Sequence, residues 1–142
     1  TAIDTSGAVP LEKSSGAILK SDLLLLDIKE IESDDCVTLT GLDNKNFIAT
    51  LNFCEKNNKD VWIRHVLLPN YTLNDIKLRK VGEFLKKYTC VKKVELLPYH
   101  TMGLYKWSEL GIKPQLEGID APSADEVENA KEIMRSFGLF AV

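Results

Sequence analysis

The sequence lacks both an apolar run long enough to cross a membrane and a surplus of charge of one sign. Apolar stretches such as Leu23 to Leu26 fall far short of the ~20 residues that a spanning helix needs. The 18 basic side chains nearly balance the 21 acidic ones, for a net charge of -3, so no electrostatic footprint for nucleic acid is present. We expect a soluble, cytoplasmic protein without a nucleic-acid or membrane partner.

Cysteine is also scarce. Cys36, Cys54 and Cys90 are odd in number and irregular in spacing, which suits neither a disulfide framework nor the paired ligands of a zinc site. They are expected to be free thiols in a reducing compartment. Cys54 continues the apolar side of a predicted helix, so we place it in the core.

The composition is that of one globular domain, residues 1–142, with 44% hydrophobic and 27% charged side chains. Its apolar runs are short and nearly continuous, which favours strands of a parallel sheet that is covered on both faces. These predicted strands are Leu23 to Leu26, Val61 to Leu68, Val91 to Leu97 and a last run at Leu139 to Val142.

Amphipathic segments alternate with the apolar runs and predict surface helices over 44–56, 73–88 and 123–137. Two capping boxes are predicted at helix starts, Thr72 with Asp75 and Ser123 with Glu126. The order indicates an α/β fold of alternating βα units with right-handed crossovers. A closed eightfold barrel needs about 250 residues, so the chain forms an open sheet or part of a barrel.

Charged side chains stand where the predicted strands end. Because ligands bind beyond the carboxyl ends of parallel strands, these positions are candidate site residues. Asp4 and Asp27 could act as general acid and base or hold a cation, while Lys29, Arg64 and His100 could receive a carboxylate or phosphate. The pattern indicates a site for a small zwitterionic or anionic molecule, without naming the reaction.

Simpler interpretations remain open for the same residues. Asp27 and Lys29 lie two apart on one strand, so they share a face and could simply pair with each other. His65 has the opposite strand parity to Arg64 and is expected to be a satisfied core or interface histidine.

Several motifs resemble the C-terminal half of pyruvate formate-lyase activating enzymes, which belong to the radical S-adenosylmethionine family. The similarity runs from Thr1 to about Phe137, and its motifs stand in the family's order. They are Asp4 to Gly7, Leu26 to Lys29, Val61 to Val66 with Pro69, Leu96 to His100, Gly103, and Lys106 with Trp107.

The resemblance implies an incomplete, TIM-like α/β barrel with a 4Fe-4S cluster and S-adenosylmethionine. In such enzymes the cofactor is split to a 5′-deoxyadenosyl radical, which takes a hydrogen from one glycine of pyruvate formate-lyase. The cluster and cofactor carry the hard chemistry, and the protein positions them. A flavodoxin or ferredoxin-type electron donor is implied as a second partner.

Site residues follow from the same resemblance. It implies that S-adenosylmethionine contacts Lys29, His100, Thr5, Asp27 and Arg64. It also implies a monovalent cation held by Asp4, Thr5, Asp27 and the Leu25 carbonyl, a set of oxygen ligands that suits a hard cation. No catalytic residue is expected within the chain itself.

The sequence departs from the family in one respect. The CxxxCxxC loop that holds the cluster is missing, and the three cysteines are too widely spaced to replace it. We therefore expect the chain to be the C-terminal portion of a longer oxidoreductase, without its N-terminal cluster-binding part, and inactive alone. The alternatives are the activase of another glycyl radical enzyme, such as a diol dehydratase or an anaerobic reductase, and a stand-alone module that binds a small anion.

Overall fold

Strands and helices alternate along most of the chain, and the strands form one parallel sheet. The computed structural model describes all 142 residues. The sheet has the order β1-β2-β3-β4, with β1 at Ala2–Thr5, β2 at Leu23–Asp27, β3 at Val61–Leu67 and β4 at Val91–Pro98. Sequential order with right-handed crossovers puts the connecting helices on one face. The predicted α/β class with a parallel sheet is confirmed.

Six helices connect or follow the strands. They are α1 at Leu11–Lys20, α2 at Ser33–Thr40, α3 at Lys45–Lys56, α4 at Asp75–Leu85, α5 at Leu104–Glu109 and α6 at Ala124–Ser136. The predicted helices correspond to α3, α4 and α6. Both α1 and α2 went unpredicted; each is short and buries a single residue, Ile18 or Cys36.

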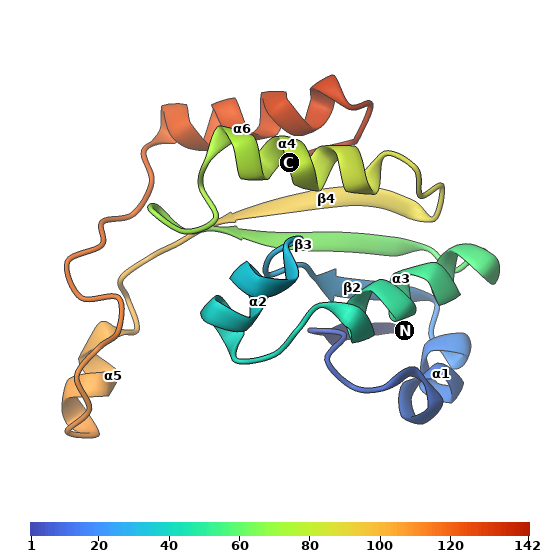
Figure 1. Cartoon of the computed structure of the whole chain (residues 1–142), viewed down its shortest axis with the longest axis horizontal. Helices are drawn as coiled ribbons and strands as arrows, with labels where there is room; N and C mark the ends of the chain where they lie inside the picture. Colours follow the sequence, from blue (N-terminus) through green and yellow to red (C-terminus); the bar gives the residue numbers. More distant parts are fainter.

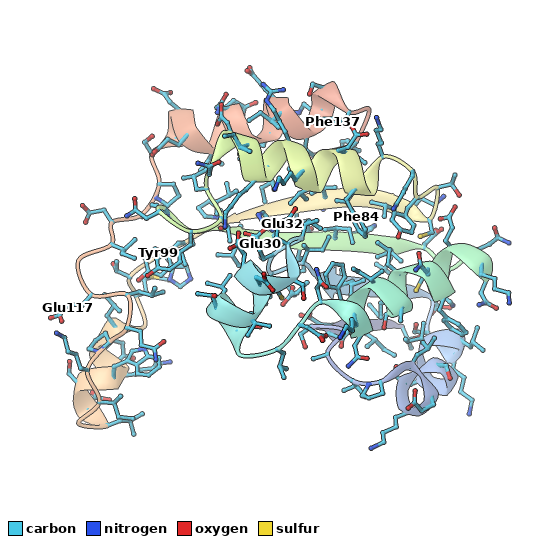
Figure 2. All side chains as sticks on the ribbon, in the orientation of Figure 1. Glu30, Glu32, Phe84, Tyr99, Glu117 and Phe137 are labelled. Atoms are coloured by element: carbon cyan, nitrogen blue, oxygen red, sulfur yellow. The ribbon has the colours of Figure 1, made fainter.

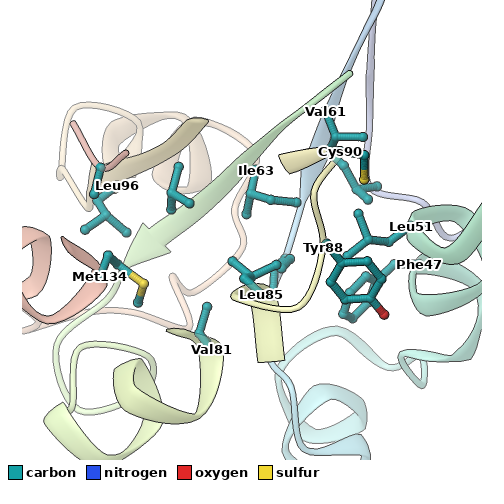
Figure 3. Packing of buried hydrophobic residues seen from close by; sticks show 14 of the residues in the cluster. Phe47, Leu51, Val61, Ile63, Val81, Leu85, Tyr88, Cys90, Leu96 and Met134 are labelled. Atoms are coloured by element: carbon teal, nitrogen blue, oxygen red, sulfur yellow. The ribbon is translucent and has the colours of Figure 1, made fainter. Parts of the chain in front are cut away.

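The core lies between one face of the sheet and the helices. Alternate strand residues, among them Ile63 and Leu96, are buried there. Figure 3 shows them in one cluster with Leu85 of α4 and Met134 of α6. Figure 1 shows α6 running beside α4 along β4. We call this side of the sheet the helix face.

The opposite side of the sheet is open, which corrects the prediction that both faces are covered. Leu25 and Trp62 alternate with fully buried neighbours and stay partly exposed. Because these residues are apolar too, the sequence lacks the alternation of apolar and polar residues that is typical of a strand with one exposed face. We call this side the bare face, and its partly exposed strand residues include Leu25, Asp27, Trp62, Arg64, Val66, Lys93, Glu95 and Leu97.

One of the two predicted capping boxes is present. At the start of α6, Ser123 accepts a hydrogen bond from the Glu126 N–H, and Glu126 answers by accepting from the Ser123 N–H. At α4 the cap is Asn74, whose side chain accepts from the first turn of the helix. Thr72 is buried instead, and its hydroxyl accepts from the Leu68 N–H at 2.8 Å, within the turn that leaves β3.

The last segments lie at the margins of the sheet. The predicted strand at Leu139 to Val142 is reduced to a single bridge between Val94 and Ala141. The short helix α5 projects away from the body of the molecule on two extended segments (Figure 1). None of the helices has the length and apolar character that a membrane span requires.

Candidate functional site

The carboxyl ends of β1 and β2 and the middle of β3 bring three charged side chains to the bare face. Asp27 is in register with Arg64, and Asp4 is in register with Leu25, so the pleat points the three charges to one side. The Arg64 guanidinium donates to the Asp4 carboxylate, and Arg64 Nε lies 3.8 Å from Asp27 Oδ1. The hydrogen bond to Asp4 is the main cause that raises the pKa of Arg64.

Lys29 extends this charged group beyond the end of β2. Its Nζ lies 2.8 Å from Asp27 Oδ2, so the pairing that the sequence left open between these two residues is present. The two side chains are 37% and 21% exposed, and solvent screening keeps such a pair weak. An incoming carboxylate can therefore take the place of Asp27 at Lys29 at little cost.

The predicted cation ligands do not converge. Thr5 is in register with Leu26 on the helix face, and its Oγ1 accepts from the Gly7 N–H at 3.1 Å. The carboxylates of Asp4 and Asp27 bind cationic side chains. In the whole chain, no group of three or more histidines, cysteines or carboxylates is placed to hold a metal ion. The predicted monovalent cation is therefore unsupported.

Three further residues of the bare face were not predicted as site residues. Glu95 is in register with Arg64, and Lys93 is in register with Trp62. Lys93 Nζ lies 2.7 Å from Glu95 Oε1 and 4.3 Å from the centre of the Trp62 ring. The sequence does contain a signal for this pair, because Lys93 and Glu95 are two residues apart on one strand and therefore lie on the same face. With them the site holds as many cations as carboxylates, namely Lys29, Arg64 and Lys93 against Asp4, Asp27 and Glu95.

A cavity of about 130 Å³ opens beside Asp27 and Lys29. This volume is less than the ~300–1,000 Å³ of a typical ligand pocket. The cavity can therefore hold a group about the size of an amino acid, which is one part of a larger ligand. We call it the rim cavity. Its other lining residues are Ser6, Ala8, Cys36, Thr40, Leu42, Asp43 and Phe47.

His100 lines a different cavity, of about 220 Å³, between the end of β4 and the α5 segment. The structure thus does not bring His100 and Lys29 into one cavity. The neighbouring Tyr99, labelled in Figure 2, has a buried hydroxyl without any hydrogen-bond partner. A buried polar group is costly unless it is paired, so this hydroxyl is ready to bond a ligand. Trp107 of α5 forms part of the same wall.

His65 is a core histidine, as predicted, but only one of its ring nitrogens has a partner. It is 2% exposed on the helix face, and its Nδ1 lies 2.9 Å from the Ile28 carbonyl oxygen. Its Nε2 is buried without a partner. Burial is the main cause that lowers the pKa of His65. Ile28 lies between Asp27 and Lys29 in the chain. Through its contact with the Ile28 carbonyl, His65 supports the backbone of these two residues from the helix face.

The cysteines do not form a ligand set. Cys36, Cys54 and Cys90 are free and buried, and the predicted core position of Cys54 is confirmed. Burial raises the pKa of Cys54 to about 11, and it also raises the pKa of Cys90. Iron–sulfur clusters are held by thiolates, so these thiols do not suit a cluster.

No protein-family profile matches the chain. It is similar to proteins named pyruvate formate-lyase-activating enzyme from two bacteria. The Streptococcus mutans enzyme is 47% identical over 126 residues, which are 89% of this chain and 48% of that enzyme. The Listeria monocytogenes enzyme is 40% identical over 126 residues, 89% of this chain and 51% of the other. The chain spans about half the length of these relatives.

Two solved structures share the fold. A domain of a pyruvate-formate lyase-activating enzyme from Bacteroides vulgatus matches with a TM-score of 0.80 at 20% identity, over 99% of this chain and 78% of that one. A radical SAM methyltransferase from Sphaerobacter thermophilus matches with a TM-score of 0.71 at 16% identity, over 99% of this chain and 39% of that one. By sequence, the chain is related to pyruvate formate-lyase-activating enzymes and spans about half the length of the relatives above.

Proposed function

We propose that the chain is the C-terminal portion of a pyruvate formate-lyase activating enzyme, an oxidoreductase of the radical S-adenosylmethionine class. The observation that carries this proposal is the 47% identity over 126 residues to the Streptococcus mutans enzyme. The site supports it, because polar side chains meet at the carboxyl ends of parallel strands, where α/β proteins bind their ligands. The complete enzyme would remove a hydrogen from one glycine of pyruvate formate-lyase.

S-adenosylmethionine and a 4Fe-4S cluster, reduced by a flavodoxin or ferredoxin-type donor, would supply the one-electron chemistry. The residues of this chain would bind and orient the cofactor. The Lys29 ammonium suits the carboxylate of the methionine part, and the rim cavity has room for a group of that size. Arg64 would fix the position of Asp27 beside it.

The second cavity would receive the nucleoside part of the cofactor. His100 and the unpaired hydroxyl of Tyr99 offer hydrogen bonds there, and the Trp107 side chain offers an apolar surface. Thr5 would not contact the cofactor, because its hydroxyl lies on the helix face and accepts a hydrogen bond within the turn after β1. The cation is left out too, because its proposed carboxylate ligands bind Arg64 and Lys29.

The cluster would be held by residues of the complete enzyme outside this chain, because the three buried cysteines do not come together as a group of metal ligands. The 142-residue chain would therefore contribute half of the cofactor site and would have no activity alone.

The test uses the complete product of the gene that encodes this chain, purified without oxygen and supplied with S-adenosylmethionine, a reductant and pyruvate formate-lyase. We expect the electron paramagnetic resonance signal of a glycyl radical on pyruvate formate-lyase. The same assay with a diol dehydratase or an anaerobic reductase is the control for specificity. A radical on one of those proteins and none on pyruvate formate-lyase would show that another glycyl radical enzyme is the substrate.

A further inference from the structure

A wide hollow of about 670 Å³ lies on the outer side of the molecule, along α4. We call it the α4 groove. Figure 2 shows Glu32 and Phe84 close together on this side, with Phe137 at the end of α6. The groove is lined by Ile31, Glu32, Arg79, Lys80, Glu83, Phe84, Lys87 and Phe137.

The floor of the α4 groove is apolar. Ile31, Phe84 and Phe137 are partly buried, and each packs against the hydrophobic core while it also lines the groove. The Phe84 ring meets the Phe47 ring edge to face at 6.2 Å, which holds it in place from below. A fixed apolar floor that opens to solvent is typical of a surface that binds another protein segment.

The walls of the groove carry an excess of positive charge. Lys80 is paired with Glu32 at 3.0 Å, and Glu83 is paired with Lys86 at 2.8 Å. Arg79 and Lys87 have no carboxylate partner. Lys87 Nζ lies 4.6 Å from the centre of the Phe84 ring, directly over the floor.

This local surplus stands on a chain whose net charge is -3. Two exposed cations beside an apolar floor therefore fit a partner segment that combines carboxylates with an apolar side chain.

The groove lies close in sequence to the charged residues at the end of β2. Ile31 follows Lys29 by two positions, and the connecting residue Glu30 is 2% exposed. Glu30 Oε2 lies 2.8 Å from Lys77 Nζ on α4, and the Asn44 side chain donates to the Ile31 carbonyl oxygen.

We propose that the α4 groove docks an acidic segment of the polypeptide substrate, at a distance from the glycine that reacts. The occupant is a stretch of Asp or Glu around one apolar side chain, which enters between Arg79 and Lys87 and rests on Phe84. This proposal rests on the proposed function. It adds a second contact, one that supplies affinity for the whole protein partner and takes no part in the chemistry.

The test compares a whole substrate with a short one, using the complete gene product in the glycyl radical assay. The variant is Arg79→Glu with Lys87→Glu, and the control is Lys13→Glu on α1, an exposed lysine with no ion pair. For whole pyruvate formate-lyase we expect the double variant to raise KM about tenfold with kcat little changed. For a short peptide around the reactive glycine, kcat/KM should stay within about twofold.

The outcomes separate the two proposals. An unchanged KM for whole pyruvate formate-lyase, an equal rise with Lys13→Glu, or an equal loss on the short peptide would overturn the docking site. Unmodified enzyme that forms no radical on either substrate would overturn the proposed function, and the docking proposal with it. As a second readout, higher salt should raise KM for the unmodified enzyme more than for the double variant, since the variant has lost the attraction that salt screens.

Discussion

At the scale of single residues, Asp4, Arg64, Asp27 and Lys29 form a row of alternating charges, which we call the rim, and each of them has a partner of opposite sign. Arg64 lies between Asp4 and Asp27, and Asp27 also holds Lys29. Lys29 is partly exposed and ends this chain, so it is the cation that a ligand carboxylate can reach with least rearrangement. Charged residues at predicted strand ends located Asp4, Asp27 and Lys29 in advance, because the topology of a parallel sheet brings such ends together, while Arg64 was a candidate inside its predicted strand.

The sequence suggested the pair of Asp27 with Lys29 on one strand, but not the pairs between neighbouring strands, such as Arg64 with Asp4. Glu95 and Lys93 escaped notice because they lie within a strand, and their role depends on the register between β3 and β4. That register shifts at Val61 and Trp62, an irregularity that no local pattern announces.

His65 makes the stability of the chain depend on pH. Burial lowers its pKa below 6.5, while Glu30 opposes this shift and Lys29 adds to it. The unfolded chain thus takes up a proton near pH 6.5 that the folded chain refuses, so stability falls as the pH drops below 6.5. We expect the free energy of unfolding to decrease by up to about 1.4 kcal/mol per pH unit in this window.

Urea unfolding at about pH 7.5 and about pH 5.5 measures this effect. His65→Gln should abolish most of the decrease, whereas His100→Gln, at an exposed position, should leave it intact. The assignment to His65 would be wrong if its variant kept the full pH dependence.

At the scale of helices and strands, the tightest contact outside the sheet joins α4 and α6. Gly82 of α4 faces the Phe137 ring so closely that a Cβ at Gly82 would lie 2.4 Å from Phe137 Cδ2. The sequence predicted both amphipathic helices. It did not predict this contact, because the contact depends on how the two helices cross.

Alanine substitutions at two helical glycines should therefore have opposite effects. Gly82→Ala forces the Phe137 ring to move and should destabilise the chain by about 1–3 kcal/mol, despite the better helix propensity of alanine. Gly16→Ala in α1 meets no atom within 4 Å and should stabilise it by about 0.5–1 kcal/mol. Urea unfolding of both variants decides the point. Equal stabilisation by the two would mean that α4 and α6 do not pack this closely.

At the scale of the whole molecule, the sheet has one covered face and one bare face. The bare face carries the charged rim together with apolar residues such as Leu25 and Trp62. Composition and periodicity predicted the parallel sheet but not its open side. Apolar residues occur on both faces of the strands, so the sequence pattern resembles that of a sheet covered on both faces. The relatives are about twice as long as this chain.

The arrangement of the cysteines predicts how the isolated chain behaves toward iron. Its three thiols are buried in separate segments, and burial raises the pKa of Cys54 and Cys90, which disfavours the thiolate form that binds iron. After anaerobic incubation with iron and sulfide, we expect the chain to remain colourless and to bind no stable cluster. A brown product with about four irons per chain would contradict this, since a 4Fe-4S cluster needs thiolate ligands that these positions do not bring together.

Binding of S-adenosylmethionine to the complete gene product, measured by equilibrium dialysis, tests the role of the rim most directly. The informative variant is Lys29→Met, and its control is Lys92→Met, another lysine in a salt bridge, which lies near the opposite end of the sheet. Loss of a charged hydrogen-bond partner should weaken binding about tenfold for Lys29→Met, while Lys92→Met should bind as the unmodified enzyme does. Equal affinity of the Lys29→Met variant and the unmodified enzyme would contradict the assignment of the rim as half of the cofactor site.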